Sequence, residues 1–433
     1  MARKSSLFGR HWHRWLFALG CVVVFAGCSD GTLEFTPNRV HALATERSRD
    51  MPTQAALDDV TVVLNKLFGT PEEPRWPADL LENEQQELVS LERLQQASGS
   101  VESDEENVHR GLYTEHCVIC HGVSGSGTGP ASMYQWPYPR DFRAGVFKWK
   151  STEHDAKPTR EDLRALLQHG IPGSPMPSFA TVSTDDRESL IDYLVYLSVR
   201  GELERKLIAL AVDEMDYGDE APEQDWRLSI TDSEEKSEGE QAVIDTLREV
   251  AGDWVAASQT SVPPEPIPGA ADELHASIAR GAALFGGQVA NCAGCHGPQG
   301  QGGMVLNDFD DWTKEFTTRV GITPTDSDAV KPFRKAGALP PRTIEPRRLA
   351  GGVLRGGDDA ETIFRRIQHG IAGTPMPGIE LSEQAAGTTG LSPADVWDLV
   401  HYVQSLVRPT PKPTAHAEEE NSLAAIPESG ATL

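Results

Sequence analysis

At 433 residues, the chain is long enough for two or three ordinary domains, each with its own core. Its 65 Asp and Glu residues against 39 Lys and Arg residues give a formal net charge of −26, which argues against nucleic acid or an anionic membrane face as a partner. The same surface would attract a basic patch on a partner protein, but solubility alone also explains the charge.

Residues 1–27 are predicted to be a lipoprotein-type signal peptide. Four cations precede an apolar run, Trp15 to Ala26, that is too short to cross a bilayer, since this takes roughly 20 residues. The segment Phe25-Ala26-Gly27-Cys28 resembles a bacterial lipobox, except that Phe25 replaces a smaller aliphatic residue. Cleavage would take the net charge from −26 to −30 and leave Cys28 lipidated on the periplasmic side of a bacterial membrane. Ordinary secretion with a free Cys28 is the alternative.

Residues 28–106 are predicted to form a helical extension on the domain that follows. Apolar residues from Leu57 to Phe68 recur at helical spacing, and Gly69 ends the run. A thinner apolar face starting at Leu81 predicts a second helix, and the acidic stretch from Ser100 to Glu106 predicts a hinge.

Two CxxCH boxes follow, Cys117-Val118-Ile119-Cys120-His121 and Cys292-Ala293-Gly294-Cys295-His296. This spacing is typical of c-type haem attachment, in which two thiols form thioethers with the haem vinyl groups and the histidine ligates iron. With Cys21 in the leader and Cys28 predicted to carry lipid, no thiol remains for a disulfide. A shared zinc site is the alternative, but the pairs are much farther apart than the usual 15–20 residues. We therefore expect two haem c groups.

A second repeat lies downstream of each box. Residues 168–177 and 368–377 are identical at eight of ten positions, and both contain Pro-Met-Pro. A thioether on stiff backbone suits the sixth position of an electron-transfer haem, so Met176 and Met376 are the predicted distal ligands. The alternative for any single methionine is a place in the core. His169 and His369 also recur, but each precedes a glycine that ends a helix, where histidine more often caps.

The repeats are separated by a predicted linker, residues 201–271. Between Asp213 and Glu240 twelve acidic residues face two basic ones, a composition usually solvated or disordered. An apolar stripe from Val243 to Trp254 predicts a helix with a packing face. The proline-rich stretch from Pro263 to Pro268 predicts an extended spacer. Residues 409–433 are predicted to be a disordered tail.

Each half resembles a class I c-type cytochrome: a helix, CxxCH, a loop region, a methionine loop and a C-terminal helix. The resemblance implies an all-α chain with two tandem cytochrome c-like domains, residues 107–200 and 272–408. It assigns Cys117, Cys120, Cys292 and Cys295 to covalent haem attachment, His121 and His296 to the proximal ligands, and Met176 and Met376 to the distal ligands.

The same resemblance implies that a proline carbonyl after the box orients the proximal imidazole. Gly129-Pro130 matches that position in the first half, whereas the second half has no such proline. The second domain also carries about 25 extra residues, expected within residues 306–339. The segments starting at Pro139-Arg140 and Pro341-Arg342 are expected to correspond, with both arginines candidates to pair with haem propionates.

These features predict an exported, lipid-anchored dihaem cytochrome c that passes single electrons between respiratory-chain proteins and has no catalytic residues. Its expected partners are redox proteins, with no nucleic acid and no small-molecule substrate. Two alternatives remain open. A dihaem peroxidase would need one iron with a sixth position that is open or can open, and a fixed cytochrome subunit would dock on a larger oxidase or reductase.

Overall fold

The computed structural model describes residues 33–263, 265–266, 271–304, 308–382 and 390–408. The predicted leader, the predicted lipid site Cys28 and the predicted tail lie outside these residues. Within them the chain is mostly helical, and its strands are two residues long, which confirms the all-α prediction. None of the described helices is both long and apolar enough to span a membrane.

The N-terminal extension packs on the first domain as predicted. Its helices are α2 (Arg39–Arg49), α3 (Gln54–Phe68) and α4 (Leu91–Ala97), with the 3-10 turns η1 (Ala78–Leu80) and η2 (Asn83–Gln85) before α4. The apolar stripe of α3 is buried, and α3 ends at Gly69 as the pattern indicates. The second predicted helix is shorter than expected, because the only α-helix between Leu81 and the first hairpin strand is α4, with the 3-10 turn η2 before it.

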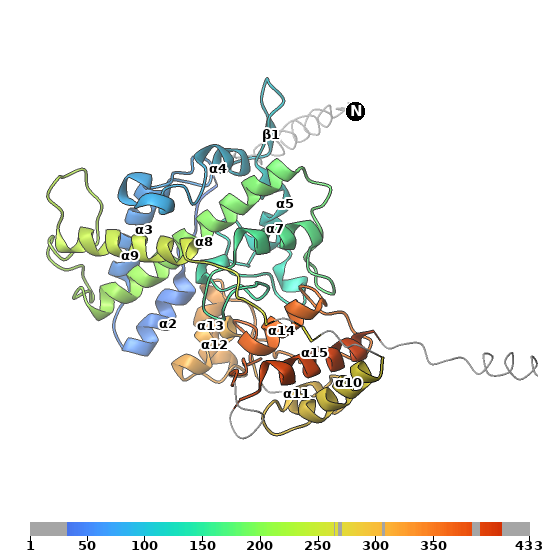
Figure 1. The fold of residues 1–433 in the computed structure, drawn as a ribbon. Coiled ribbons are helices and arrows are strands. Elements are labelled where there is room, and N and C mark those ends of the chain that lie inside the picture. The colour runs from blue at the N-terminus through green and yellow to red at the C-terminus, as the bar shows by residue number, and fades with distance from the viewer. Residues whose placement is uncertain (1–32, 264, 267–270, 305–307, 383–389, 409–433) are drawn as a thin grey trace, which may run out of the picture.

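The stretch predicted as a hinge is instead an ordered hairpin. Strands β1 (Glu102–Ser103) and β2 (His109–Arg110) pair antiparallel and project from the body of the molecule (Figure 1). The chain then rejoins the end of α4, where the Gly111 amide donates to the Gln96 carbonyl at 3.0 Å. The acidic side chains of this stretch are mostly exposed to solvent, and backbone hydrogen bonds between β1 and β2 hold its conformation.

The first domain is built around one long helix. Its elements are α5 (Leu112–His116), α6 (Val118–His121), η3 (Ser132–Tyr134), η4 (Phe142–Ala144), α7 (Arg160–His169) and α8 (Thr184–Asp213). Helix α8 runs through the middle of this part of the molecule and contacts α3, α4, α5, α7 and η4 (Figure 1). It continues well past residue 200, so the predicted end of the domain falls inside a helix.

The predicted linker folds back onto the first domain. Helix α9 (Glu238–Val255) buries the stripe from Val243 to Trp254 against α8, as its spacing predicts. The acidic segment before α9 is not a disordered run: Tyr217 and Leu228 are buried, and Arg227 pairs with Asp59 of α3 at 2.6 Å. One core therefore includes the extension, the first domain and α9.

The second domain has a smaller core between its terminal helices. Its elements are α10 (Ala271–Phe285), α11 (Cys292–His296), α12 (Asp311–Glu315), η5 (Thr318–Val320), α13 (Ser327–Lys335), α14 (Ala360–His369) and α15 (Pro393–Val407). Helices α10 and α15 pack together, and Gly281 lets α10 approach the Asp398 carbonyl of α15 closely. Ser277 bonds Asp398 and His401 at the same crossing.

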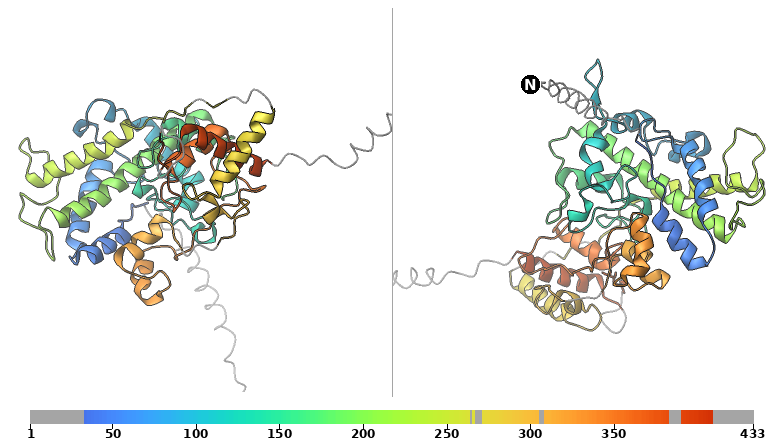
Figure 2. Two further views of the ribbon diagram at one scale, coloured as in Figure 1. Left: turned by 60° about the horizontal axis from the view of Figure 1, so that its bottom comes forward. Right: turned by 180° about the vertical axis from the view of Figure 1, so that it is seen from behind.

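The extra residues of the second domain lie where they were expected and form a separate subdomain. Helices α12 and α13 and the turn η5 build a third apolar cluster, and α2 of the extension completes it. Both ribbon views place this subdomain between α2 and the rest of the second domain (Figures 1 and 2). The extra residues therefore join the second domain to the N-terminal extension.

Candidate haem sites

The first CxxCH box ends in a histidine that is prepared to ligate a metal. His121 is buried at the end of α6, and its Nδ1 lies 2.9 Å from the Arg140 carbonyl. A carbonyl oxygen only accepts, so Nδ1 donates and Nε2 keeps the lone pair that iron needs. Burial lowers the pKa of His121 to about 4, which favours the neutral imidazole. Phe142 stacks on the ring at 4.4 Å between centroids.

The second box repeats this arrangement. His296 ends α11, and its Nδ1 lies 2.7 Å from the Arg347 carbonyl. Burial lowers the pKa of His296 as well. The site is less enclosed than the first, since Cys295 is exposed whereas Cys120 is half-buried. In both boxes a backbone carbonyl binds Nδ1 of the histidine and leaves Nε2 free.

These carbonyls correct two sequence predictions. The group that orients His121 is the Arg140 carbonyl, not a carbonyl in Gly129-Pro130. In the second domain its counterpart is Arg347, so Pro346-Arg347, and not Pro341-Arg342, matches Pro139-Arg140. The Phe142 amide bonds the Gly125 carbonyl at 2.8 Å, and at the matching positions the Leu349 amide bonds the Gly300 carbonyl at 2.7 Å, which fixes the register.

The four thiols of the boxes are free. Burial raises the pKa of Cys117 to about 12 and that of Cys292 to about 11, so both thiols are neutral at pH 7. Gln135 donates from Nε2 to the Cys120 sulfur at 2.7 Å. Among the described residues no three His, Cys, Asp or Glu side chains gather closely enough to hold a metal ion.

The two methionine loops have the same backbone turn. The Ile171 amide donates to the Met176 carbonyl at 3.1 Å, and the Ile371 amide to the Met376 carbonyl at 3.2 Å. A hydroxyl tightens each turn: Ser174 donates to the Ile171 carbonyl, and Thr374 to the Ile371 carbonyl. Both methionines are half-buried, and Met176 packs on the core that also contacts Cys117. The eight-of-ten identity thus encodes one local structure used twice.

A glycine is required where each loop leaves its helix. Gly170 ends α7 with φ +65°, and a Cβ there would lie 2.5 Å from the Pro177 carbonyl carbon. Gly370 ends α14 with φ +72°, and a Cβ there would lie 2.6 Å from the Met376 carbonyl oxygen. Residues with a Cβ rarely adopt positive φ. Glycine at this position therefore allows the loop to fold tightly over the end of the helix.

The rival histidine ligands differ between the domains. His169 is exposed at the end of α7. His369, at the end of α14, has a buried Nε2 with no hydrogen-bond partner among the described residues. The environments of the two histidines are therefore not equivalent, whereas the two methionines follow the same backbone turn.

Buried cations near the boxes fit the carboxylates of haem. Arg140 is half-buried, its buried Nη1 has no hydrogen-bond partner among the described residues, and desolvation lowers its pKa to about 9. Its guanidinium lies 3.8 Å from the Trp312 ring centroid of the second domain. Arg342 has another role: it donates to the Met133 and Gln135 carbonyls of the first domain. Arg140 therefore fits a propionate, whereas Arg342 holds the two domains together.

The domains also contact one another reciprocally. The Arg140 guanidinium lies next to Gly373 in the second methionine loop, and the Arg347 guanidinium lies next to Gly173 in the first. Arg355 adds two hydrogen bonds to the Gly173 carbonyl, at 3.1 and 3.0 Å. Each methionine loop thus faces the residue that orients the histidine of the other domain.

Sequence reasoning missed Phe142, Trp312 and Arg347. Phe142 had a weak signal, because it follows the Pro-Arg pair that orients His121. Arg347 also follows a proline, but a nearer Pro-Arg pair at 341–342 concealed it. Trp312 had no local signal, since its contact with Arg140 joins distant parts of the chain.

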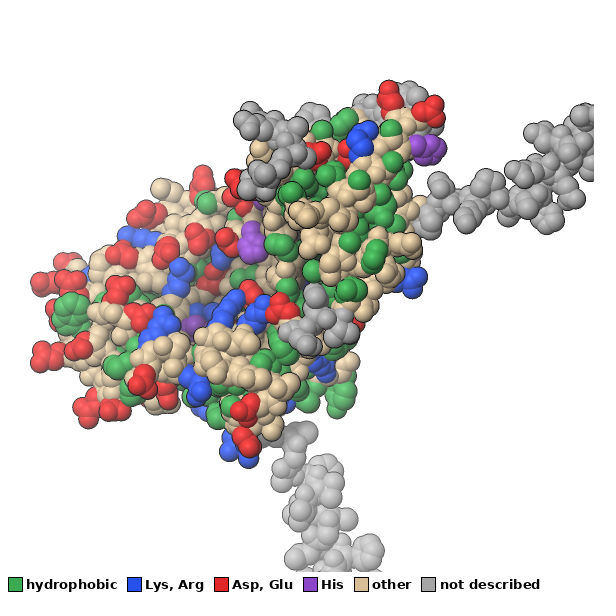
Figure 3. Space-filling view, turned by 90° about the horizontal axis from the view of Figure 1, so that it is seen from below, with side chains coloured by type: hydrophobic (Ala, Val, Ile, Leu, Met, Phe, Trp, Pro, Cys, Tyr) green, Lys and Arg blue, Asp and Glu red, His purple; other side chains and the backbone are tan. Residues whose placement is uncertain are grey.

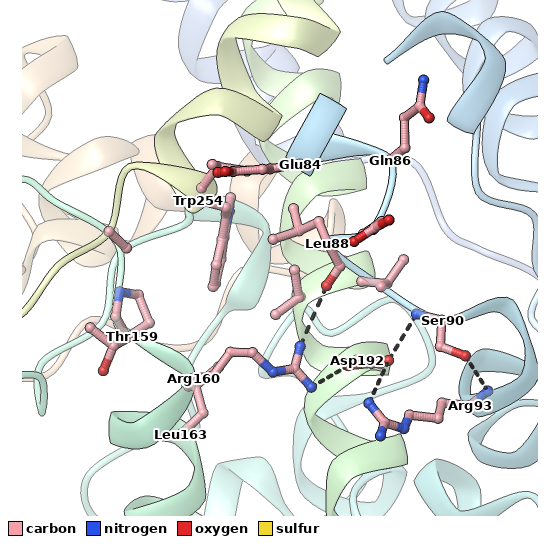
Figure 4. Close-up of a pocket in the computed structure, with 16 residues that line it drawn as sticks. Glu84, Gln86, Leu88, Ser90, Arg93, Thr159, Arg160, Leu163, Asp192 and Trp254 are labelled. Atoms are coloured by element: carbon pink, nitrogen blue, oxygen red, sulfur yellow. Dashed lines mark hydrogen bonds and ion pairs between the residues drawn. The ribbon is translucent and has the colours of Figure 1, made fainter. Parts of the chain in front are cut away.

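A cavity of about 720 Å³ lies away from both boxes (Figure 4). The extension, α7, α8 and the end of α9 surround it, and Trp254 and Leu88 form part of its apolar wall. Arg160 crosses it to pair with Asp192 at 2.6 Å. No residue of either CxxCH box lines it, so this cavity is separate from the haem sites.

Two all-α domains, each with a CxxCH box and an oriented histidine, define a two-domain haem protein. The Cytochrome c family model matches residues 110–198 and 278–407, just over half of the chain, and the protein belongs to this family. Haem c binding and electron transfer are what this membership indicates. No curated protein matches the chain. A chain of the reducing HAO-like protein complex of Kuenenia stuttgartiensis is 22% identical, with a TM-score of 0.42 over 72% of this chain and 100% of that one.

Proposed function

We propose that this cytochrome c is a dihaem electron carrier, exported and anchored by lipid at Cys28, that passes single electrons between respiratory-chain proteins. The observation that carries the proposal is the duplicated site: in both domains a backbone carbonyl orients the histidine of the box and the same turn presents a methionine. Bound haem c supplies the one-electron iron couple.

In this proposal each haem is held by one box and its methionine loop. Cys117 and Cys120 attach the first haem, with His121 and Met176 as axial ligands. Cys292 and Cys295 attach the second, with His296 and Met376. A class I arrangement of this kind leaves no open iron position, which favours a carrier over an enzyme. The reciprocal contacts of Arg140 and Arg347 support electron exchange between haems, because they place each methionine loop against the other domain.

The attachment claim is tested by haem content. Protein made with a c-type maturation system should carry two covalently bound haems by intact mass and by the pyridine haemochrome assay. Replacing Cys117 and Cys120 with Ser should leave one haem, and so should replacing Cys292 and Cys295. A wild-type protein with a single haem would refute the dihaem proposal.

The carrier claim is tested against the peroxidase alternative. The purified dihaem protein should be low-spin in both redox states and should not turn over hydrogen peroxide with a reduced cytochrome as donor. A high-spin haem in either state together with steady peroxide consumption would favour the enzyme.

Anchoring and partner choice are tested in cells and in vitro. Cys28→Ser should move the protein from the membrane fraction to the soluble periplasmic fraction, while Cys21→Ser, inside the leader, should not.

Acidic side chains gather at the end of the molecule where α8 ends and α9 begins, which supports a partner with a basic docking patch (Figure 3). Electron exchange with such a partner should slow as ionic strength rises. Constant co-purification with oxidase or reductase subunits would instead support a fixed subunit.

A further inference from the structure

A small pocket at the domain interface collects positive charge in an acidic protein. It lies between residues 148–154 of the first domain and α14 of the second. Its basic side chains are Lys148, Lys150, His154, Arg365, Arg366 and His369. No Asp or Glu among the described residues lines it. Both domains therefore contribute positive groups to one place.

Several of these groups lack a negative partner. Lys148, Lys150 and Arg366 form no salt bridge within the described part of the chain. Lys150 donates to the Thr152 hydroxyl and to the backbone carbonyls of Glu153, His154 and Ala156, and Arg366 donates to the Gly357 carbonyl. His369 has its buried Nε2 unpaired. Neutral acceptors take up all three N–H groups of Lys150 and part of the guanidinium of Arg366, so no carboxylate neutralises either charge by direct contact.

Burial and mutual repulsion both act against the charges. Burial lowers the pKa of Lys148 to about 7, of Lys150 to about 8 and of Arg366 to about 10. The pKa of His369 is lowered by burial and then by the positive charges of Lys150, Arg365 and His154.

Carboxylates outside the pocket oppose this effect without entering it. They are Asp310 and Asp311 near Lys148, Glu153, Asp155 and Asp162 near Lys150, Asp358 and Asp359 near Arg366, and Glu153 near His369. An anion inside the pocket would therefore interact favourably with every lining cation.

We propose that this pocket binds a small inorganic oxyanion between the two domains. The cavity is about 10 Å³, enough for one oxygen-sized group, so the ligand places a single anionic oxygen there while the rest stays at the mouth. Lys150 and His154 are partly exposed and stand at that mouth. Lysine and arginine donors match the charge and hydrogen bonding of such an anion. A ligand held by both domains stabilises their docked arrangement.

The test uses the holoprotein with both haems and inorganic phosphate as the probe. Isothermal titration at constant ionic strength, with sodium chloride as the balancing salt, should show one phosphate bound per chain. Lys150→Gln and His369→Gln should each weaken binding at least tenfold. Lys335→Gln, which removes an exposed lysine from α13, should leave the affinity unchanged.

Thermal unfolding gives a second reading that does not depend on heat of binding. Phosphate should raise the unfolding temperature of the wild type more than chloride does, and should raise that of Lys150→Gln less. Unchanged visible spectra confirm that the variants keep both haem environments. Absence of phosphate binding overturns the proposal, as expected if a haem propionate already fills the pocket. Equal binding by wild type and both pocket variants overturns it too.

Discussion

The two domains share the groups that would hold a haem and differ in almost everything around them. In the first, the histidine and its orienting carbonyl are 19 residues apart, and in the second 51. The longer segment of the second domain contains the subdomain of α12, η5 and α13, which packs on α2. The first domain obtains its cover from the extension and α9 instead. Duplication has kept the local turns, whereas the surroundings of each site have diverged.

The difference in cover implies a difference in reduction potential. The first site belongs to a large core and has a buried histidine stacked on Phe142, while the second has a small core and an exposed Cys295. Burial disfavours the additional positive charge of ferric haem, so it raises the potential. We expect the first haem to have the higher potential and to receive electrons from the second.

The largest expected effect comes from the glycine before a methionine loop. Gly170→Ala would force a Cβ against the Pro177 backbone at positive φ, which costs about 1–3 kcal/mol in strain before any clash. The first haem should lose its Met-ligated signature while the second keeps it, as seen in near-infrared spectra of the oxidised protein. Gly321→Ala is the matched control, because its φ is +73° but nothing lies within 4 Å. Equal effects of the two variants would contradict this explanation.

Trp312→Ala should loosen the contact between the domains. The ring lies over the guanidinium of Arg140 and 5.0 Å from the Lys148 ammonium, so its loss removes packing and two cation–π contacts of about 0.5–2 kcal/mol each. We expect calorimetric unfolding to separate into two transitions, one for each domain. The exposed Trp226, replaced by Ala, should leave a single transition. A single transition in Trp312→Ala would show that the subdomain does not hold the domains together.

Glu315 gives the domain contact a pH dependence. Burial raises the pKa of Glu315, but the Arg205 guanidinium at 2.8 Å and a hydrogen bond with His41 at 2.7 Å outweigh this effect and hold the pKa well below its usual range. Because the folded pKa is depressed, the stabilisation is present above about pH 4.5 and declines as the pH falls toward the folded value. Glu315→Gln should lower stability by about 1–3 kcal/mol at pH 7 and reduce this decline. The loss of stability at low pH is measured by acid unfolding of the wild type and of Glu315→Gln. Parallel unfolding curves would show that Glu315 is not the source of this pH dependence.

The smallest expected effect comes from Arg342. Arg342→Gln removes two hydrogen bonds to the Met133 and Gln135 carbonyls and the contact with Tyr138, for a loss of about 1–2 kcal/mol. Its haem spectra and potentials should stay unchanged, because the orienting residue is Arg347. A shift in the second haem potential would restore Arg342 as a haem contact.

Residue type and spacing predicted the boxes, the paired methionine loops and helix α3, because each depends on side chains close in sequence. The orienting groups were mispredicted, since a backbone carbonyl carries no residue-type signal and two Pro-Arg pairs compete in the second domain. The acidic segment was predicted to be solvated or disordered: its acidic side chains are mostly exposed, but Tyr217 and Leu228 anchor it in the core. The contact between Trp312 and Arg140 joins residues far apart in the sequence, so no sequence pattern predicts it.

The central claim is that each domain holds one haem between a box histidine and a loop methionine. Oxidised-state near-infrared spectra of the wild type, Met176→Ala and Met376→Ala test it most directly. We expect two Met-ligated haems in the wild type and one in each variant, with a different haem altered in each case. If both variants keep the wild-type spectrum, the methionines are not the ligands and the claim is wrong.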